Sequence, residues 1–309
     1  MRKFDSSPIL QTLERDSDNG PERRRFLRQA GIAGLMGALG AYALNNPTIA
    51  DAQGGVLNDV NILNFALNLE YLEAEFYLRA VFGRGLADSD TDGTGTRGAV
   101  TGGRAVPFAS EAIRQYATEI ARDEEAHVRF FRRSLGADRI ARPAIDLMGS
   151  FTAAARAAGI IGSTDIFDPF ADENSFLLAA FVFEDVGVTA FKGSARFLTN
   201  KDFLEATAGV LAVEAYHAGI IRTVLFARGL RTPAQQISDL RDGVDGATDI
   251  DQGIIGPDGL ANLVPTDGDA IAFSRTPRQV LNIVFLQANA ASGGFFPQGV
   301  NGGLNGTTA

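Results

Sequence analysis

Both histidines of this chain belong to one repeated motif. Each of the two follows a glutamate by three positions, as Glu124/His127 in "DEEAHVRFF" and as Glu214/His217 in "LAVEAYHAGII". Residues i and i+3 share one face of a helix, so each motif presents a carboxylate beside an imidazole. With 13 glutamates among 309 residues, both coincidences together would arise by chance about once in 500 cases. The repeat therefore predicts a site shared by two helices.

Apolar spacing and the lack of internal proline predict four long helices. They are residues 60–81, 110–135, 175–198 and 202–228. Ser110 is the expected N-cap of the second helix and Gly136 its C-cap. The third and fourth helices are joined by a short turn, whereas about 40 residues separate the second from the third. This pattern predicts an all-α four-helix bundle with one long crossover.

The first and third helices each place a carboxylate on an apolar face. Glu70 lies on the buried stripe of the first helix and Glu73 lies on nearly the same face, so either can be the ligand. Glu75 is expected to face solvent. The third helix carries Glu184 after nine uncharged residues, and a buried carboxylate is costly unless it is paired or binds a metal. The expected ligands are Glu70, Glu124, His127, Glu184, Glu214 and His217.

The order Glu, Glu-x-x-His, Glu, Glu-x-x-His over four helices resembles the ferritin-like di-metal carboxylate proteins. "NLEYLEAEFY" resembles their first helix, with Glu70 followed seven residues later by Tyr77. "NFALNLEYLEAEFY" and the terminal "GGFFPQGVNGG" resemble the desiccation-related members of that superfamily. The resemblance implies a terminal carboxylate and one histidine for each metal, with Glu124 and Glu214 as bridges. Four carboxylates and two imidazoles suit iron or manganese, so two Fe or two Mn ions per chain are expected.

Neighbouring side chains are candidates to support these ligands. Glu73, Tyr77 and Tyr216 are candidates to hydrogen-bond the carboxylates, and an ordinary core position is the alternative for the two tyrosines. Asp123 and Asp185 each adjoin a ligand in the sequence. Their two alternatives are to orient that ligand or to lie in solvent.

Residues 1–52 have the features of an export signal. The segment "RRRFL" at residues 23–27 resembles the core of a twin-arginine signal, and a glycine-rich apolar run follows at residues 30–44. An uncleaved membrane anchor is the alternative, but the run is short for a membrane span. We expect cleavage after Ala52 and a mature protein in the periplasm or another extracytoplasmic compartment, without a membrane partner.

Composition narrows the chemistry and the partners. The net charge of −9 disfavours nucleic acid as a partner. The absence of cysteine excludes disulfides and thiolate metal ligands.

Residues 53–229 are expected to form the bundle. Residues 230–309 are expected to form a C-terminal extension of short helices and Gly-rich turns packed on it. That extension and the long first loop argue against a 24-subunit ferritin cage, while a smaller oligomer stays open.

Two functions fit these features. The first is an exported protein with a binuclear non-haem iron or manganese site that handles oxygen, peroxide or metal under stress, by ferroxidase, peroxidase or catalase-like chemistry. The second is a structural desiccation- or stress-related protein in which the metal only stabilises the fold. The sequence alone leaves open whether the protein is an enzyme.

Overall fold

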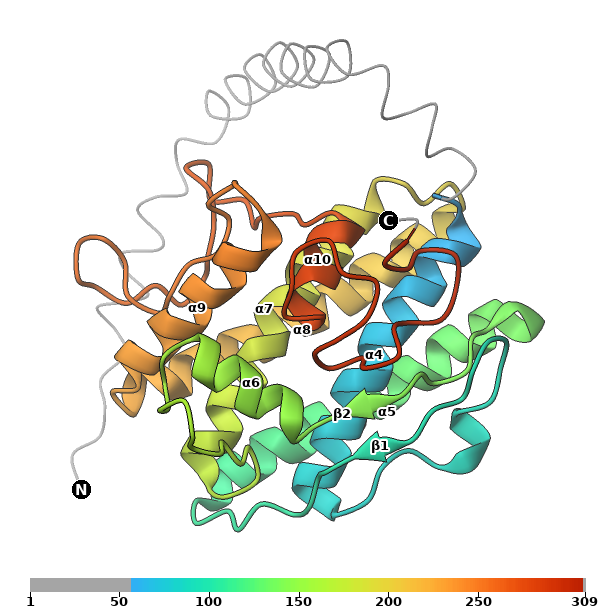
Figure 1. Ribbon diagram of the computed structural model, residues 1–309. Coiled ribbons are helices and arrows are strands. Elements are labelled where there is room, and N and C mark those ends of the chain that lie inside the picture. Colours follow the sequence, from blue (N-terminus) through green and yellow to red (C-terminus); the bar gives the residue numbers. More distant parts are fainter. Residues whose placement is uncertain (1–56, 308–309) are drawn as a thin grey trace, which may run out of the picture. The chain divides into compact units, whose positions relative to one another are not determined.

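The computed structural model describes residues 57–307, and most of that part of the chain is helical (Figure 1). The expected export signal, residues 1–52, lies outside the described residues. Four long helices make up the bundle: α4 (Asp59–Phe82), α5 (Glu111–Leu135), α7 (Glu173–Ala195) and α8 (Lys201–Ala227). The predicted all-α fold is confirmed, and each predicted window matches one helix to within three residues at either end.

Side-chain caps set the ends of these helices. The N-caps, each accepting a hydrogen bond from a backbone N–H of the first turn, are Asn58, Ser110, Asp172 and Asn200. Because Asp172 caps the N–H of Ser175, α7 begins two residues before the predicted start. Gly83 and Gly136 end α4 and α5 in the left-handed region, with φ of 67° and 57°, where glycine has no steric penalty.

Contacts between helix ends show that the helices run antiparallel within each of two pairs. Asn64 near the start of α4 donates to the carbonyl of Asp138, just after the end of α5, at 2.9 Å. Glu173 at the start of α7 pairs with Arg228 at the end of α8 at 2.5 Å. The bundle therefore has two antiparallel pairs, α4 with α5 and α7 with α8, joined by the long crossover that was predicted.

The crossover and the first loop carry the remaining short elements. These are η2 (Asp88–Asp90), β1 (Val100–Thr101), η3 (Gly136–Asp138), β2 (Ile145–Asp146) and α6 (Gly149–Ala157). The two strands pair in parallel, with Val100 opposite Ile145. They join the first loop to the crossover, so both long connections lie over the same part of the bundle (Figure 1).

Buried arginines fasten these two connections to α4 and α5. Arg132 of α5 donates to the Tyr71 hydroxyl and to the carbonyl of Asp92, both at 2.6 Å. Arg142 of the crossover pairs with Glu75 of α4, which is fully buried. The expectation that Glu75 faces solvent is therefore wrong, because the crossover covers that face of α4 and supplies a cation to it.

Aromatic side chains fill the bundle end that faces α6. Phe76 of α4 contacts five aromatic rings, including those of Phe151, Phe176 and Phe183. Phe295 from the chain's last segment continues this cluster, with its ring centroid 4.8 Å from that of Phe151 and 4.9 Å from that of Phe183. The C-terminal segment is thus part of the main hydrophobic core.

The C-terminal extension adds two helices, α9 (Arg231–Asp245) and α10 (Pro277–Val284). Thr276 and Gln279 form a capping box before α10, a typical helix start. After α10 the chain runs across α4 (Figure 1). There Asn301 and Asn68 exchange two hydrogen bonds, at 2.9 and 3.2 Å.

A buried network, here called the arginine–aspartate cluster, joins the extension to α7 and α8. It consists of Arg222, Arg241, Arg275, Asp185, Asp245 and Asp251. Arg222 and Arg241 both donate to Asp185 Oδ2, at 2.7 and 3.0 Å. Arg275 donates to Asp251 Oδ2 at 2.7 Å. Because buried charges are tolerated only when they are paired, this network determines where the extension sits on the two helices.

Helices α7 and α8 are long and apolar enough to cross a membrane by length and composition alone. In α7, 89% of the apolar window is buried inside the protein, as expected of a core helix. In α8 the value is 39%, and Tyr216 is the one large hydrophobic side chain of this helix that is exposed.

Candidate metal centre

The six predicted ligands lie together in the middle of the bundle. They are Glu70 on α4, Glu124 and His127 on α5, Glu184 on α7, and Glu214 and His217 on α8. All six are buried. The imidazole centroids are 6.5 Å apart, so both motifs face one shared space. That these residues bind metal stays a prediction, since the structure shows their positions only.

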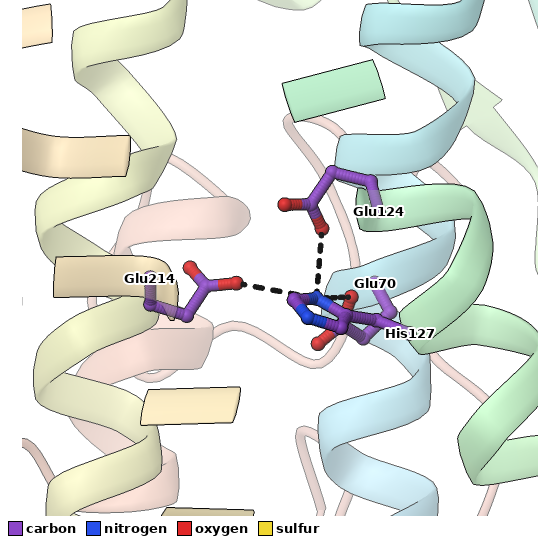
Figure 2. A group of neighbouring side chains, drawn as sticks. All are labelled: Glu70, Glu124, His127 and Glu214. Atoms are coloured by element: carbon purple, nitrogen blue, oxygen red, sulfur yellow. Dashed lines mark ion pairs between the residues drawn. The ribbon is translucent and has the colours of Figure 1, made fainter. Parts of the chain in front are cut away.

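The first half of the site surrounds His127 (Figure 2). Its Nδ1 atom lies 3.3 Å from Glu70 Oε2, 3.6 Å from Glu124 Oε2 and 3.8 Å from Glu214 Oε1. One potential ligand atom from each of these four residues lies within 4.8 Å of the others. Three helices thus bring a carboxylate to one imidazole nitrogen.

The second half surrounds His217. Its Nδ1 atom lies 3.0 Å from Glu124 Oε1 and 3.7 Å from Glu184 Oε2. Glu124 therefore directs one oxygen toward each histidine, which is the position of a bridging carboxylate. Glu214, the other expected bridge, approaches His127.

Glu73, the alternative ligand on α4, is also inside the site. Its side chain is buried, and its Oε2 atom has no hydrogen-bond partner. Glu70 contacts His127, whereas Glu73 lies with Glu214 beside Gly187 of α7. The site therefore contains five glutamates, and both Glu70 and Glu73 are among them.

The buried polar atoms of this centre fit a metal. Carboxylate oxygens or imidazole Nδ1 atoms without a hydrogen-bond partner occur in Glu70, Glu73, Glu124, His127, Glu184, Glu214 and His217. Buried carboxylates without a partner carry a large desolvation cost, which a coordinated cation offsets. Oxygen and imidazole donors suit iron and manganese. The donor set thus matches a pair of such ions.

Burial and mutual repulsion raise the pKa of most of these carboxyl groups. Burial is the main cause for Glu70, whose pKa rises to about 8, and for Glu184, whose pKa rises to about 7. Burial also raises the pKa of Glu73 and of Glu214 well above the ordinary value, with neighbouring glutamates adding to it. Without a metal, protons supply the positive charge that these side chains need.

The charged members of the centre are Glu124 and the histidines. Burial opposes ionisation, yet the carboxylates facing the histidines raise the pKa of His127 to about 11 and that of His217 to about 10. Burial also acts against Glu124, but the two positively charged imidazoles beside it lower its pKa below the ordinary value. A metal ion that binds Nδ1 of either histidine must displace the proton on that nitrogen.

Two of the candidate supporting residues contact ligands. The Tyr77 hydroxyl donates to Glu184 Oε1, which leaves Oε2 facing His217. Asp123 lies 3.1 Å from His217 Nε2. With the proton on Nε2, donating to this carboxylate, His217 Nδ1 is available to a metal.

The other two candidates face away from the centre. The side chain of Tyr216 is 74% exposed, because one residue of helical rotation from His217 turns it out of the bundle. Both alternatives for Tyr216, a hydrogen bond to a ligand and an ordinary core position, are therefore wrong. Asp185 belongs to the arginine–aspartate cluster, where Arg222 and Arg241 bind it. Both alternatives predicted for Asp185, orienting a ligand and lying in solvent, are therefore wrong.

Sequence reasoning missed Gly187, one turn after Glu184 on α7. A Cβ atom here would overlap Glu214 Oε2 and would lie 3.2 Å from Glu214 Cδ and 3.5 Å from Glu73 Oε1. Only glycine leaves room for these carboxylates beside α7. The signal available in the sequence was a glycine inside a predicted helix, because glycine usually destabilises a helix interior.

Comparison with known proteins agrees with this arrangement. Residues 58–227, which span all four long helices, match the family described as the ferritin-like domain. The chain belongs to the ferritin-like family. The ferritin-like catalase Nec2 of Nesocodon mauritianus is 29% identical over 271 residues, covering 82% of this chain and 86% of that protein. The desiccation-related protein PCC13-62 of Craterostigma plantagineum is 33% identical over 247 residues, covering 72% of this ferritin-like chain and 76% of that protein. No solved structure matches.

The raised carboxyl pKa values predict how the stability of the metal-free protein depends on pH. Folded Glu70 and Glu184 keep protons up to about pH 8 and 7, whereas the unfolded chain releases them near 4.5. The free energy of unfolding should therefore fall between about pH 5 and pH 8, by up to about 1.4 kcal/mol per pH unit for each group. The histidines act in the same direction above about pH 6.5. Urea denaturation of metal-free protein across this range measures the slope, and a flat or rising stability would contradict it.

Replacement of Gly187 by alanine should weaken metal binding. The added methyl group displaces Glu214 or Glu73, and displaced ligands or their supports commonly cost about tenfold or more in metal affinity. Gly209→Ala on α8 is the matched control, since no atom lies within 4 Å of a Cβ there. Elemental analysis and metal titration should show reduced affinity for Gly187→Ala and unchanged affinity for Gly209→Ala. Equal affinity in both variants would contradict the role of Gly187.

Proposed function

We propose that this protein binds two iron or two manganese ions and disproportionates hydrogen peroxide into water and dioxygen. The observation that carries the proposal is the group of buried carboxylates and imidazoles without partners, gathered between two histidines. The name of one relative, a ferritin-like catalase at 29% identity, supports peroxide as the substrate.

The reaction converts two molecules of hydrogen peroxide into one dioxygen and two water molecules. One peroxide loses two electrons and two protons, and the other gains them as its O–O bond breaks. A bound pair of iron or manganese ions supplies the reversible two-electron change that this exchange needs. The two protons released by the first peroxide must reach the second peroxide, through protein carboxyl groups or through water.

Glu73 is the carboxyl best suited to hold a proton. It is buried beside Glu214, and its pKa lies well above the ordinary value because of burial and the neighbouring glutamates. Its Oε2 atom has no hydrogen-bond partner among the described residues. Once bound metal replaced protons as the balancing positive charge, Glu73 would be ionised, and it would accept one of the two protons from the first peroxide and return it to the second.

The centre is almost completely closed to solvent. The His127 side chain is 11% exposed, and every glutamate of the centre is buried to at least 96%. Asp123, which contacts His217, has a side chain that is 42% exposed and lies in an open surface depression along α5 beside Arg122. We infer that peroxide enters near α5, beside the exposed edges of His127 and Asp123, and that burial of the glutamates keeps larger molecules out of the centre.

Export before function is part of the same proposal. The twin-arginine-like segment at residues 23–27 supports secretion of the folded, metal-loaded chain and cleavage after Ala52. Replacing Arg23 and Arg24 together by lysine should retain the protein inside the cell, as measured by fractionation and immunoblotting. Secretion of that variant at the normal level would contradict this route.

The alternative is a structural stress protein in which metal stabilises the bundle without turnover. Two observations favour it: a relative at 33% identity is named a desiccation-related protein, and the buried carboxylates gain stability from any suitable cation. The two functions differ in one respect, which is whether the loaded centre reacts with peroxide.

Oxygen evolution separates the two functions. Mature protein with about two Fe or Mn per chain should release dioxygen from hydrogen peroxide, measured with an oxygen electrode. The double variant Glu124→Ala/His217→Ala removes a bridging carboxylate and an imidazole, and it should bind little metal and lose at least about a hundredfold in rate. Glu205→Ala, at an exposed position of α8 away from the centre, is the control. Fully loaded protein without oxygen evolution would support the structural alternative instead.

A further inference from the structure

One face of α8 is exposed to solvent but carries no charge. It is here called the α8 face, and it consists of Ala208, Gly209, Ala212, Ala215, Tyr216, Thr223 and Ala227. The charged residues of α8 after Glu205 are buried in the metal centre or in the arginine–aspartate cluster. The outer face of a surface helix usually carries charged side chains, as that of α5 does with Arg122 and Arg129. A surface depleted in charge is typical of the core of a protein–protein interface.

Tyr216 lies at the middle of the α8 face. Its side chain is 74% exposed, and the other residues of this face are alanine, glycine and threonine. No atom lies within 4 Å of a Cβ atom placed at Gly209, two turns before it, or at Gly219, one turn after it. The face is therefore low on both sides of one projecting ring, which allows a second helix to approach closely. Tyrosine is also among the residues that contribute most to the binding energy of interfaces.

The composition of the α8 face argues against a membrane as its partner. Helices that lie on a membrane present bulky apolar side chains such as Leu, Phe or Trp, with Lys and Arg on their polar side. The α8 face has one bulky side chain, that of Tyr216, and contains neither Lys nor Arg. A protein surface fits it better.

The two ends of the α8 face carry charges of opposite sign. Glu205 is exposed at its start, and Arg231 is exposed at its end, with the guanidinium group 4.9 Å from the centre of the Phe226 ring. Neither charge forms an ion pair with another residue of the described range 57–307. Glu205 precedes Tyr216 by eleven residues and Phe226 follows it by ten. The two charges are thus placed almost evenly about Tyr216.

This placement selects a second copy of the chain as the partner. When two α8 helices meet antiparallel about a two-fold axis at Tyr216, Arg231 of each copy lies opposite Glu205 of the other, and the two Tyr216 rings meet at the axis. In a parallel arrangement, like charges would face each other at both ends.

We propose that the α8 face is the interface of a homodimer with antiparallel α8 helices, in which Tyr216 packs against its counterpart and Glu205 pairs with Arg231 of the second copy. All predicted metal ligands belong to one chain. The proposal therefore does not depend on the function proposed for the metal centre, and peroxide turnover per chain should not depend on the dimer.

Analytical ultracentrifugation of the mature protein at micromolar concentrations tests the interface and should give the mass of two chains. Tyr216→Glu places two carboxylates at the axis and should raise the dissociation constant of the dimer at least about tenfold. Ile166→Glu is the matched control, because Ile166 is 73% exposed on the crossover, and it should leave the dimer unchanged. A wild-type protein that is monomeric, or a dimer that Tyr216→Glu does not weaken, would overturn the proposal.

Exchange of the two end charges tests the antiparallel arrangement. Glu205→Arg and Arg231→Glu should each raise the dissociation constant several-fold, because each single variant places like charges opposite one another. The double variant Glu205→Arg/Arg231→Glu makes the charges opposite again and should recover most of the wild-type affinity. A double variant as weak as the single ones would overturn the arrangement. Circular dichroism and metal content, measured on each variant, distinguish loss of the dimer from loss of the fold.

Discussion

Mutual repulsion among five carboxylates buried around two imidazoles is the constraint on which the rest of this structure depends. Each helix of the bundle brings at least one of these groups to a space that excludes water. Such a group is stable only when a cation or protons balance its charge. The raised pKa values of Glu70 and Glu184 express this need for positive charge. A bound metal ion would meet the same need by displacing these protons.

The parts of the fold outside the four helices hold that centre in place. Arg142 of the crossover and Arg132 of α5 fix the first loop and the crossover to α4. The arginine–aspartate cluster binds the C-terminal extension to α7 and α8 through Asp185, which adjoins Glu184. The extension was expected to be a structural addition. Its buried arginines make it part of the framework that orients two ligand-bearing helices.

Much of this arrangement could be predicted from the sequence because it depends on local periodicity. The spacing of apolar residues located the helices, and the two Glu-x-x-His motifs identified helix faces that meet at the centre. The errors concern contacts between distant segments. Glu75 was placed in solvent because Arg142 lies 67 residues away in the sequence, and Asp185 was misassigned because its partner Arg241 is 56 residues away. The room that Gly187 provides for Glu214 depends on helix packing, which periodicity does not give.

The most direct test of this account is anomalous X-ray scattering, recorded at the iron and manganese absorption edges from crystals of protein purified with its native metal. The account predicts two anomalous peaks inside the bundle, one beside Nδ1 of His127 and one beside Nδ1 of His217, with Glu124 between them. A single peak elsewhere, or no peak at either edge in protein that retains this fold, would contradict it.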